Sequence, residues 1–389
     1  MLPLAGQVRN YAWGSPTAIP NILGTDPTGE PQAEYWLGAH PIAPSTIGGQ
    51  PLNALMKEHP EWVGKRCRQV FGDRFPVLMK ILAADKPLSL QAHPDETQAR
   101  EGFAREEAAG LDRDAPQRTY KDDWPKPELI ISLTEFDALC GFREPAATVE
   151  LFRRLGVYGE LDSVLKPLTQ RRGSAALAQV FLDILSLDDD AMVARTVQAA
   201  RAHVAAPYEL GDFARTAVEL DAHFPHQPSI LAALLLNRVH LEPGEGMYLP
   251  PRTLHSYLHG VGVEVMASSD NVLRGGLTKK HIDVDELIHV VEFVPSVAAP
   301  VEREAVDGFW RYVTPTPQFT AWRGELNHKV VTVPATKTCR IALATDGEAE
   351  LRSDAGVLDL DVGEAALIPY GERVTATGSA TLFVSAPGV

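Results

Sequence analysis

The chain has few cysteines, and it has neither a long apolar run nor a basic run. Its three cysteines, Cys67, Cys140 and Cys339, are scattered and odd in number. That pattern excludes a disulfide framework and a cysteine-ligated zinc ribbon, and it indicates a reducing compartment. No apolar stretch reaches membrane-spanning length, and residues 1–10 lack the features of a secretory signal. We therefore expect a cytoplasmic protein with no membrane partner.

Positive charge is also in short supply. The formal net charge is −15, and no Lys/Arg-rich run interrupts the sequence. This balance argues against a nucleic-acid partner, although a few well-placed cations can still bind a small anion. The 389 residues, 45% hydrophobic and 22% charged, suffice for two or three domains with their own cores.

The predicted secondary structure changes twice along the chain, from strands to helices and back to strands. Residues 1–144 read mainly as strands and loops, with one helix that begins after Asp95 and ends near Gly110, and a strand over 129–133. Residues 145–228 have helical periodicity, notably over 148–155, 175–187, 191–208 and 212–224. Strand patterns return in 229–299 and 300–389. The predicted fold is mostly β with a helical insert.

Four side chains suggest a metal site. Gln91 and His93 are two residues apart in an apolar run, so a strand would point both toward one side. Glu128 and His255 are further candidates downstream. A mixed nitrogen and oxygen set without cysteine suits a catalytic zinc better than a structural one.

A repeat supports the placement of His255. Residues 242–255 align with 361–374 at an offset of 119, so that Gly244 matches Gly363 and Pro250 matches Pro369. The repeat predicts a glycine turn, a strand and a proline that directs the chain inward. The residue five beyond that proline is His255 in the first copy and Val374 in the second. The spacing resembles the second motif of cupins, which are small double-sheet jelly rolls. We therefore expect two cupin-like barrels: a metal-binding one from 1–144 and 229–299, and a degenerate one at 300–389.

Longer motifs resemble one enzyme family, the type I mannose-6-phosphate isomerases. The segments that carry the resemblance, in family order, are Tyr11–Gly14, Glu34–Pro41, Pro87–Asp95, Tyr120–Asp122, Lys126–Leu129, Leu254–Leu258 and Glu264–Thr278.

The resemblance implies a zinc enzyme that interconverts mannose 6-phosphate and fructose 6-phosphate through a cis-enediol. It implies one Zn²⁺ per chain, held by Gln91, His93, Glu128 and His255, and it makes Arg274 an active-site cation. Two departures from the family pattern stand out. Pro125 replaces a histidine that precedes the Lys-Pro-Glu motif, so no proton-transfer role passes to this position. Lys279 replaces the usual proline before Lys280.

The chemistry requires a base, an electrophile and a phosphate clamp. Lys126 and Asp270 are both candidates for the base, since a nearby Zn²⁺ would favour a neutral, proton-accepting lysine. Arg274 would stabilise the enediolate, or else close a turn by pairing with Asp270. Ser89 and Lys280 are the expected phosphate contacts, and Tyr257 shares a strand face with His255. Lys80 is a further phosphate candidate that we read as more typical of a surface lysine.

Other interpretations stay open. The chain could be a metal-dependent isomerase of another sugar or sugar phosphate, or a non-catalytic cupin that binds a sugar phosphate. We expect a monomer. The remaining histidines, His40 among them, read as structural or surface residues, and Asp188–Asp190 as the start of a helix.

Overall fold

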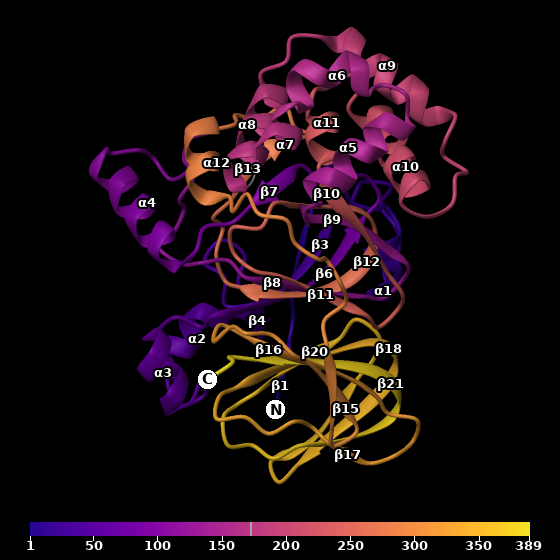
Figure 1. The fold of residues 1–389 in the computed structure, drawn as a ribbon. Helices are drawn as coiled ribbons and strands as arrows, with labels where there is room; N and C mark the ends of the chain where they lie inside the picture. Colours follow the sequence, from indigo (N-terminus) through magenta and orange to yellow (C-terminus); the bar gives the residue numbers. More distant parts are fainter. Residues whose placement is uncertain (172) are drawn as a thin grey trace.

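The computed structural model describes residues 1–389 except residue 172. Two large β-sheets are stacked, and a helical region covers the upper one (Figure 1). The predicted fold class, mostly β with a helical region, is therefore confirmed, whereas the two barrels and the domain limits stay predictions. The helices are α1 (Ala18–Ile22), α2 (Leu52–Glu58), α3 (Lys65–Phe71), α4 (Glu96–Ala108), α5 (Pro145–Arg154), α6 (Tyr158–Leu165), α7 (Pro167–Gln170), α8 (Ser174–Leu185), α9 (Asp190–Arg201), α10 (Tyr208–His223), α11 (Ser229–Ala233) and α12 (Val284–Val290).

The upper sheet has ten strands and carries the candidate site. Its main path runs β10-β9-β12-β6-β3-β2, and β7, β8, β11 and β13 attach to it. All of its paired strands are antiparallel. The strands are β2 (Gln7–Arg9), β3 (Glu34–Gly38), β6 (Val77–Ala84), β7 (Leu90–Ala92), β8 (Glu128–Ser132), β9 (Phe136–Phe142), β10 (Leu236–Leu241), β11 (Gly246–Leu249), β12 (His255–Ala267) and β13 (Leu273–Gly276).

Strand β12 joins the two halves of this sheet. Its first half lies between β7 and β9, and its second half lies between β6 and β8. Glu128 pairs with Met266, which lies 11 residues beyond His255, roughly 36 Å along an extended strand. The carboxylate of Glu128 is nevertheless 3.3 Å from the imidazole of His255. The sheet therefore curls back on itself, and the two halves of β12 face each other across the site.

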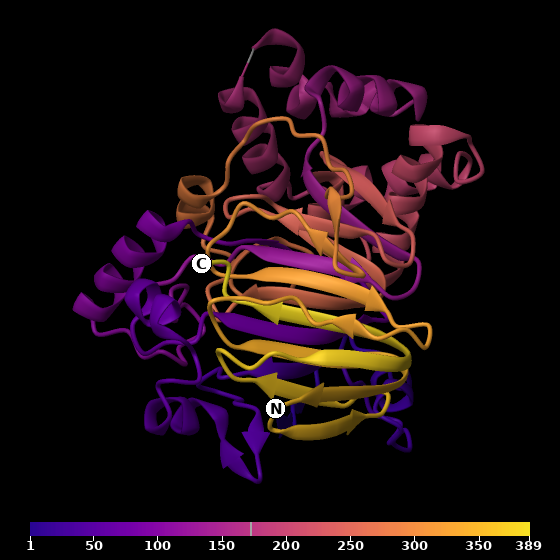
Figure 2. The ribbon, with the colours of Figure 1, turned by 90° about the horizontal axis from the view of Figure 1, so that it is seen from below.

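The lower sheet has nine strands and lies near both chain ends (Figures 1 and 2). Its edge strand β1 comes from the N-terminus and pairs with β20. A small hairpin, β4 (Thr46–Ile47) with β5 (Gln50–Pro51), stands apart from both large sheets. The strands of the lower sheet are β1 (Leu2–Leu4), β14 (Arg303–Val306), β15 (Phe309–Tyr312), β16 (Thr320–Glu325), β17 (Val331–Thr332), β18 (Arg340–Ser353), β19 (Gly356–Leu360), β20 (Ala365–Ile368) and β21 (Thr375–Ala386).

The two sheets bury a shared apolar core. In β6, Met79 and Ile81 pack in one cluster with Ile341 and Leu367 of the lower sheet. Because strand side chains alternate, the side chain of Lys80 between them points the other way, toward the inner face of the curled upper sheet. Glu128 in β8 and Glu264 in β12 follow the same rule, since their strand neighbours belong to the shared core. The inner face of these strands therefore carries the charged groups of the site.

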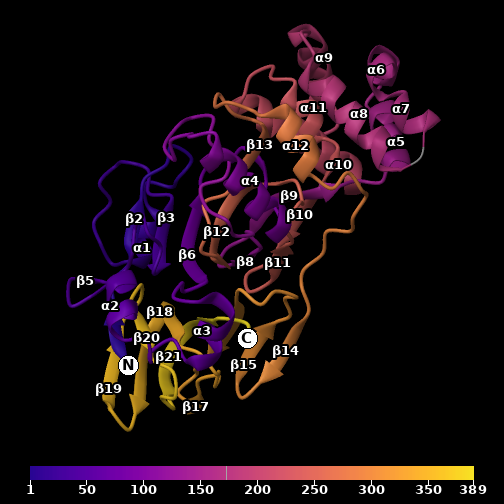
Figure 3. The ribbon, with the colours of Figure 1, turned by 90° about the vertical axis from the view of Figure 1, so that its left-hand side faces the viewer.

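In the chain, the helical region α5–α11 follows β9 and precedes β10; in space it lies next to these two paired strands (Figures 1 and 3). The two helices expected over 191–208 and 212–224 are present as α9 and α10, with different limits: α9 ends at Arg201, and α10 begins at Tyr208, directly after Pro207, which lacks a backbone donor. One more helix, α11, follows the proline-rich 225–228 segment. As predicted, the Asp189 carboxylate caps α9 by accepting the Met192 N–H.

The sequence repeat is also a structural repeat. Gly244 and Gly363 both adopt positive φ, at 86° and 84°. The next strands, β11 and β20, begin and end at the same offset of 119 residues. His255 and Val374 then lie at equivalent positions, and both are buried. Residues 1–94, expected to contain only strands and loops, also contain α1, α2 and α3; the longest of these has seven residues, too short for a clear helical period.

Candidate metal centre and its cavity

Three of the four predicted metal ligands converge. The Nε2 atom of His93 is 3.3 Å from one carboxylate oxygen of Glu128, and the Nε2 atom of His255 is 3.3 Å from the other. One ligand atom from each residue lies within 4.8 Å of the other two. All three side chains are buried. His93 comes directly after β7, Glu128 begins β8 and His255 begins β12, so three separate segments build the cluster.

The hydrogen bonds of the two imidazoles point their lone pairs into this cluster. The Nδ1 atom of His93 is 2.7 Å from the carbonyl of Asn271, and that of His255 is 2.9 Å from the carbonyl of Thr253. A carbonyl only accepts, so each Nδ1 carries the proton and each Nε2 presents a lone pair. Burial lowers the pKa of His93 to about 4, against the opposing effect of Glu128, so this ring is neutral near pH 7.

This arrangement fits a cation. Two lone pairs face a carboxylate, and the buried Nε2 of His93 donates to and accepts from no described residue. Burial alone would raise the pKa of Glu128, but His93, Lys126 and His255 hold it well below its usual range. A divalent ion among these atoms would satisfy all of them. Neutral imidazoles held by backbone carbonyls, with one carboxylate, are typical of zinc sites.

Gln91 lies on the same face as this cluster. In the antiparallel ladder it is directly opposite His255 on one side and Arg274 on the other. Residues opposite each other in such a ladder project to the same side of the sheet. Gln91 also lines the cavity described next. Its role as the fourth ligand stays a prediction.

A cavity of about 1260 Å³ opens beside the cluster, and each of the other predicted site residues lines it. Arg274 is half-buried and pairs with no carboxylate among the described residues; Asp270, its suggested partner, pairs with His40 instead. Burial lowers the pKa of Arg274, and burial together with Arg274 lowers that of Lys280. Ser89 precedes β7 and is partly exposed to the cavity. Arg274, Lys280 and Ser89 therefore give this side of the cavity positive charge and hydrogen-bond donors, which suit an anion.

Lys126 precedes β8 and lies close to the metal cluster. Its Nζ atom is 3.3 Å from Glu128 Oε1, and its side chain is 12% exposed. The expectation that it faces the same cavity as Glu128 is therefore confirmed, although it lies just before the strand. Its role in proton transfer stays a prediction.

The reading of Lys80 as a surface residue is wrong. Lys80 is 5% exposed and pairs with Glu34 at 3.3 Å and Glu264 at 3.1 Å. Burial would lower the pKa of Lys80, but the two carboxylates raise it. The hydroxyl of Tyr257 donates to Glu264 at 2.9 Å, and the ring of Trp36 donates to Glu34 at 2.7 Å. The sequence contained a signal, since Lys80 and Glu264 each stand alone in an apolar strand.

His40, which we read as structural or surface, is buried, lines the cavity and lies 3.3 Å from Asp270. Asp122 and Asn271 went unnoticed. The side chain of Asn271 accepts from the backbone N–H of Lys121 at 2.7 Å and donates to the carbonyl of Trp124 at 2.9 Å.

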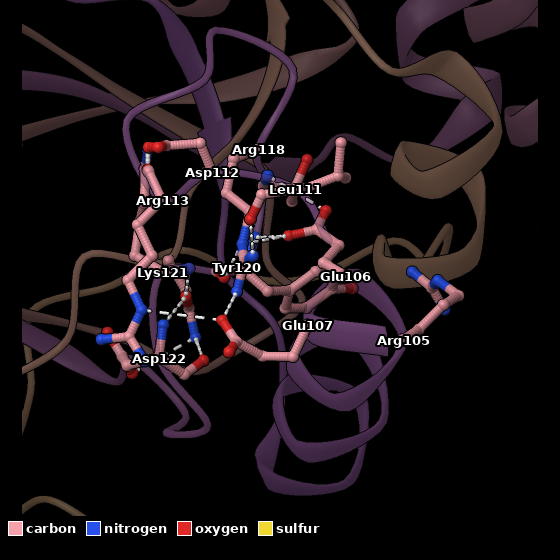
Figure 4. A network of polar contacts seen from close by, with 12 residues as sticks. Arg105, Glu106, Glu107, Leu111, Asp112, Arg113, Arg118, Tyr120, Lys121 and Asp122 are labelled. Carbon is pink, nitrogen blue, oxygen red and sulfur yellow. Dashed lines mark hydrogen bonds and ion pairs between the residues drawn. The ribbon is translucent and has the colours of Figure 1, made fainter. Parts of the chain in front are cut away.

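A buried network fixes the loop that leads to Lys126. Arg118 is 0% exposed at its side chain and donates to the carbonyls of Tyr120 and Leu111 at 2.7 and 2.6 Å (Figure 4). It also pairs with Glu106 at 2.9 Å and Glu107 at 2.6 Å, both on α4. Through these contacts α4 holds the segment 111–120 in place.

The structure defines a candidate metalloenzyme of the β class. Its buried His–Glu–His centre lies on a curled antiparallel sheet, beside a cavity whose lining includes cations unpaired among the described residues.

Comparison with known proteins identifies the family within this class. Residues 1–145 match the family model of the phosphomannose isomerase type I catalytic domain. Mannose-6-phosphate isomerase of Salmonella typhimurium is 36% identical, with 98% of each chain covered. The enzyme of Escherichia coli is 34% identical over the same shares.

Solved structures agree. A crystal structure of mannose 6-phosphate isomerase bound with zinc and yttrium has a TM-score of 0.90 and 34% identity, with both chains covered in full. A zinc-bound holo form has a TM-score of 0.90 and 33% identity, covering 100% of this chain and 99% of that one. The chain belongs to the type I phosphomannose isomerase family. Over the described residues, no helix is long and apolar enough to cross a membrane.

Proposed function

We propose that the chain is a zinc-dependent aldose–ketose isomerase that interconverts D-mannose 6-phosphate and D-fructose 6-phosphate. The observation that carries this proposal is the buried His93 Nε2 lone pair, which faces Glu128 and has no other described partner. His93, Glu128 and His255 would hold one Zn²⁺, with Gln91 as the fourth ligand. The zinc-bound relatives support the choice of metal.

In the proposed reaction, a base removes the proton from C2 of the open-chain aldose. The C–H electron pair forms the C1=C2 bond, and the carbonyl pair moves to O1, which takes up a proton. The O2 proton then leaves, C2 becomes the carbonyl, and C1 receives a proton. Bound Zn²⁺ supplies a Lewis acid for the oxygens that gain negative charge.

The residues of this chain provide the rest. Asp270 and Lys126 line the cavity as proton-transfer groups, and Arg274 offers paired donors to developing negative charge. Ser89 and Lys280 are proposed to bind the phosphate, and Tyr257 to line the sugar site. The proposed active unit is a monomer. The three free, buried cysteines support a cytoplasmic location.

The test uses mannose 6-phosphate with deuterium at C2, incubated with the zinc-loaded protein in water and followed by NMR. We expect fructose 6-phosphate to form while solvent hydrogen replaces part of the label. Binding of the sugar phosphate without conversion would contradict the isomerase assignment and support a non-catalytic cupin that binds a sugar phosphate.

A further inference from the structure

His40 is a buried histidine of the cavity that lies outside the metal centre. It follows β3, its side chain is 3% exposed, and its Nε2 atom is 3.3 Å from Asp270 Oδ2. The edge of its ring meets that of Trp36, with the ring centroids 4.8 Å apart and an interplanar angle of 74°. The imidazole is therefore fixed in place with one nitrogen directed at a proposed proton-transfer group.

The backbone determines which nitrogen of His40 carries the proton. The N–H of Ile42 donates to Nδ1 at 3.4 Å, so Nδ1 is an acceptor and the proton of the neutral ring lies on Nε2. Burial lowers the pKa of His40, against the opposing effect of Asp270, and this favours the neutral ring. His40 thus donates its Nε2–H to the Asp270 carboxylate.

Asp270 keeps access to the cavity despite this contact. Its side chain is 29% exposed, and its backbone N–H donates to Asp122 at 2.9 Å, which anchors the main chain on the opposite side. Lys126, the competing candidate, is 12% exposed, and its Nζ atom is 3.3 Å from Glu128, a proposed metal ligand. Pro125 cannot transfer a proton. Asp270 is therefore the candidate with the more open path to the cavity.

We propose that His40 is a positioning residue for proton transfer: its Nε2–H orients the Asp270 carboxylate, which serves as the base. This proposal rests on the proposed function. A hydrogen bond to the charged form of a carboxyl group also stabilises that form. The other charged groups that face this pair are Asp122, Lys80, Lys126 and Arg9. Unlike these groups, His40 is oriented by a backbone contact, the Ile42 N–H that donates to its Nδ1 atom.

The test compares zinc-loaded variants by steady-state kinetics across pH. His40→Leu removes the donor, and we expect kcat to fall about 10- to 100-fold, as for other orienting contacts, with little change in KM. His40→Gln places an amide N–H near the position of Nε2 and should recover most of the activity. His240→Leu is the matched control, because it breaks an equivalent His–Asp pair, 3.2 Å from Asp137, on the exterior.

Two readouts separate positioning from a merely structural role. A hydrogen bond to a carboxylate stabilises its charged form, so in His40→Leu the acid limb of kcat/KM against pH should move to higher pH. In an Asp270→Asn background, His40→Leu should cost far less than in the wild type. Zinc content and thermal melting, measured on every variant, identify one that has failed to fold, and His40→Gln then carries the test.

An unchanged acid limb in an active His40 variant, or additive losses in the double variant, would overturn the proposal. So would a His40→Gln enzyme as impaired as His40→Leu. A wild-type protein without isomerase activity would contradict the proposed function instead, so the two failures are distinguishable.

Discussion

At the scale of residues, the site is marked by polar side chains in positions where burial is costly. Lys80, Glu128 and Glu264 each lie within apolar strands and are at most 5% exposed. Charges remain in such places only when partners or a bound ion compensate for their desolvation. Lys80 has two carboxylate partners and Glu128 has Lys126, whereas the buried Nε2 atom of His93 has no partner among the described residues. The sequence alone predicted the His93–Glu128–His255 group, but we read Lys80 as a surface residue although it stands alone in an apolar strand.

Glu128→Gln tests the metal centre directly. The amide removes the negative charge and one oxygen donor, so zinc measured by atomic absorption should fall from about one per chain to a small fraction, and activity should fall with it. Glu135→Gln is the matched control, since Glu135 belongs to an exposed Glu135–His240–Glu242 group of similar spacing. A fully loaded Glu128→Gln protein would contradict the proposed ligand set.

Arg274→Lys tests the paired donors of the guanidinium. Lysine keeps the charge but loses the fork, so kcat should fall roughly 10²-fold while zinc content stays at the wild-type level. The measurement is kcat and KM for mannose 6-phosphate on the zinc-loaded variant. An unchanged kcat with a raised KM would assign Arg274 to uniform substrate binding instead of charge stabilisation.

At the scale of elements, the sequence predicted helices whose ends are set by neighbouring residues. Helix α4 was expected from Asp95, which indeed accepts the Gln98 N–H in a capping box, and its predicted end at Gly110 lies two residues beyond Ala108. The curl of β12 was not predictable, because it depends on strands paired over long sequence distances. The loop before Glu128 was missed for the same reason: its anchors, Arg118 and Asn271, act through tertiary contacts.

Asn271→Ala tests how that loop is held. The substitution leaves the backbone N–H groups of Lys121 and Asp122 without their acceptor, which should cost about 1–3 kcal/mol in the free energy of unfolding. It should also raise KM, since Lys126 follows in the same loop. Urea denaturation and steady-state kinetics measure the two effects. As a control, Thr97→Ala changes an exposed residue of α4 and should alter neither; wild-type stability in Asn271→Ala would contradict this role.

At the scale of the whole molecule, the lower sheet covers the apolar outer face of the upper one. This contact frees the inner face of β6, β8 and β12 for charged groups. The repeat at an offset of 119 residues predicted that two related strand–turn units exist, and it predicted which one carries a histidine. It did not predict that β1 would join the distant lower sheet, because an edge strand of three residues has almost no pattern of its own.

We propose that one zinc ion held by these residues makes the chain an isomerase. The most direct test removes the metal by chelation and then titrates zinc back while the conversion of mannose 6-phosphate is followed. We predict that activity disappears without metal and returns in proportion to added zinc up to one equivalent per chain. Full turnover by the metal-free protein would contradict this role of zinc.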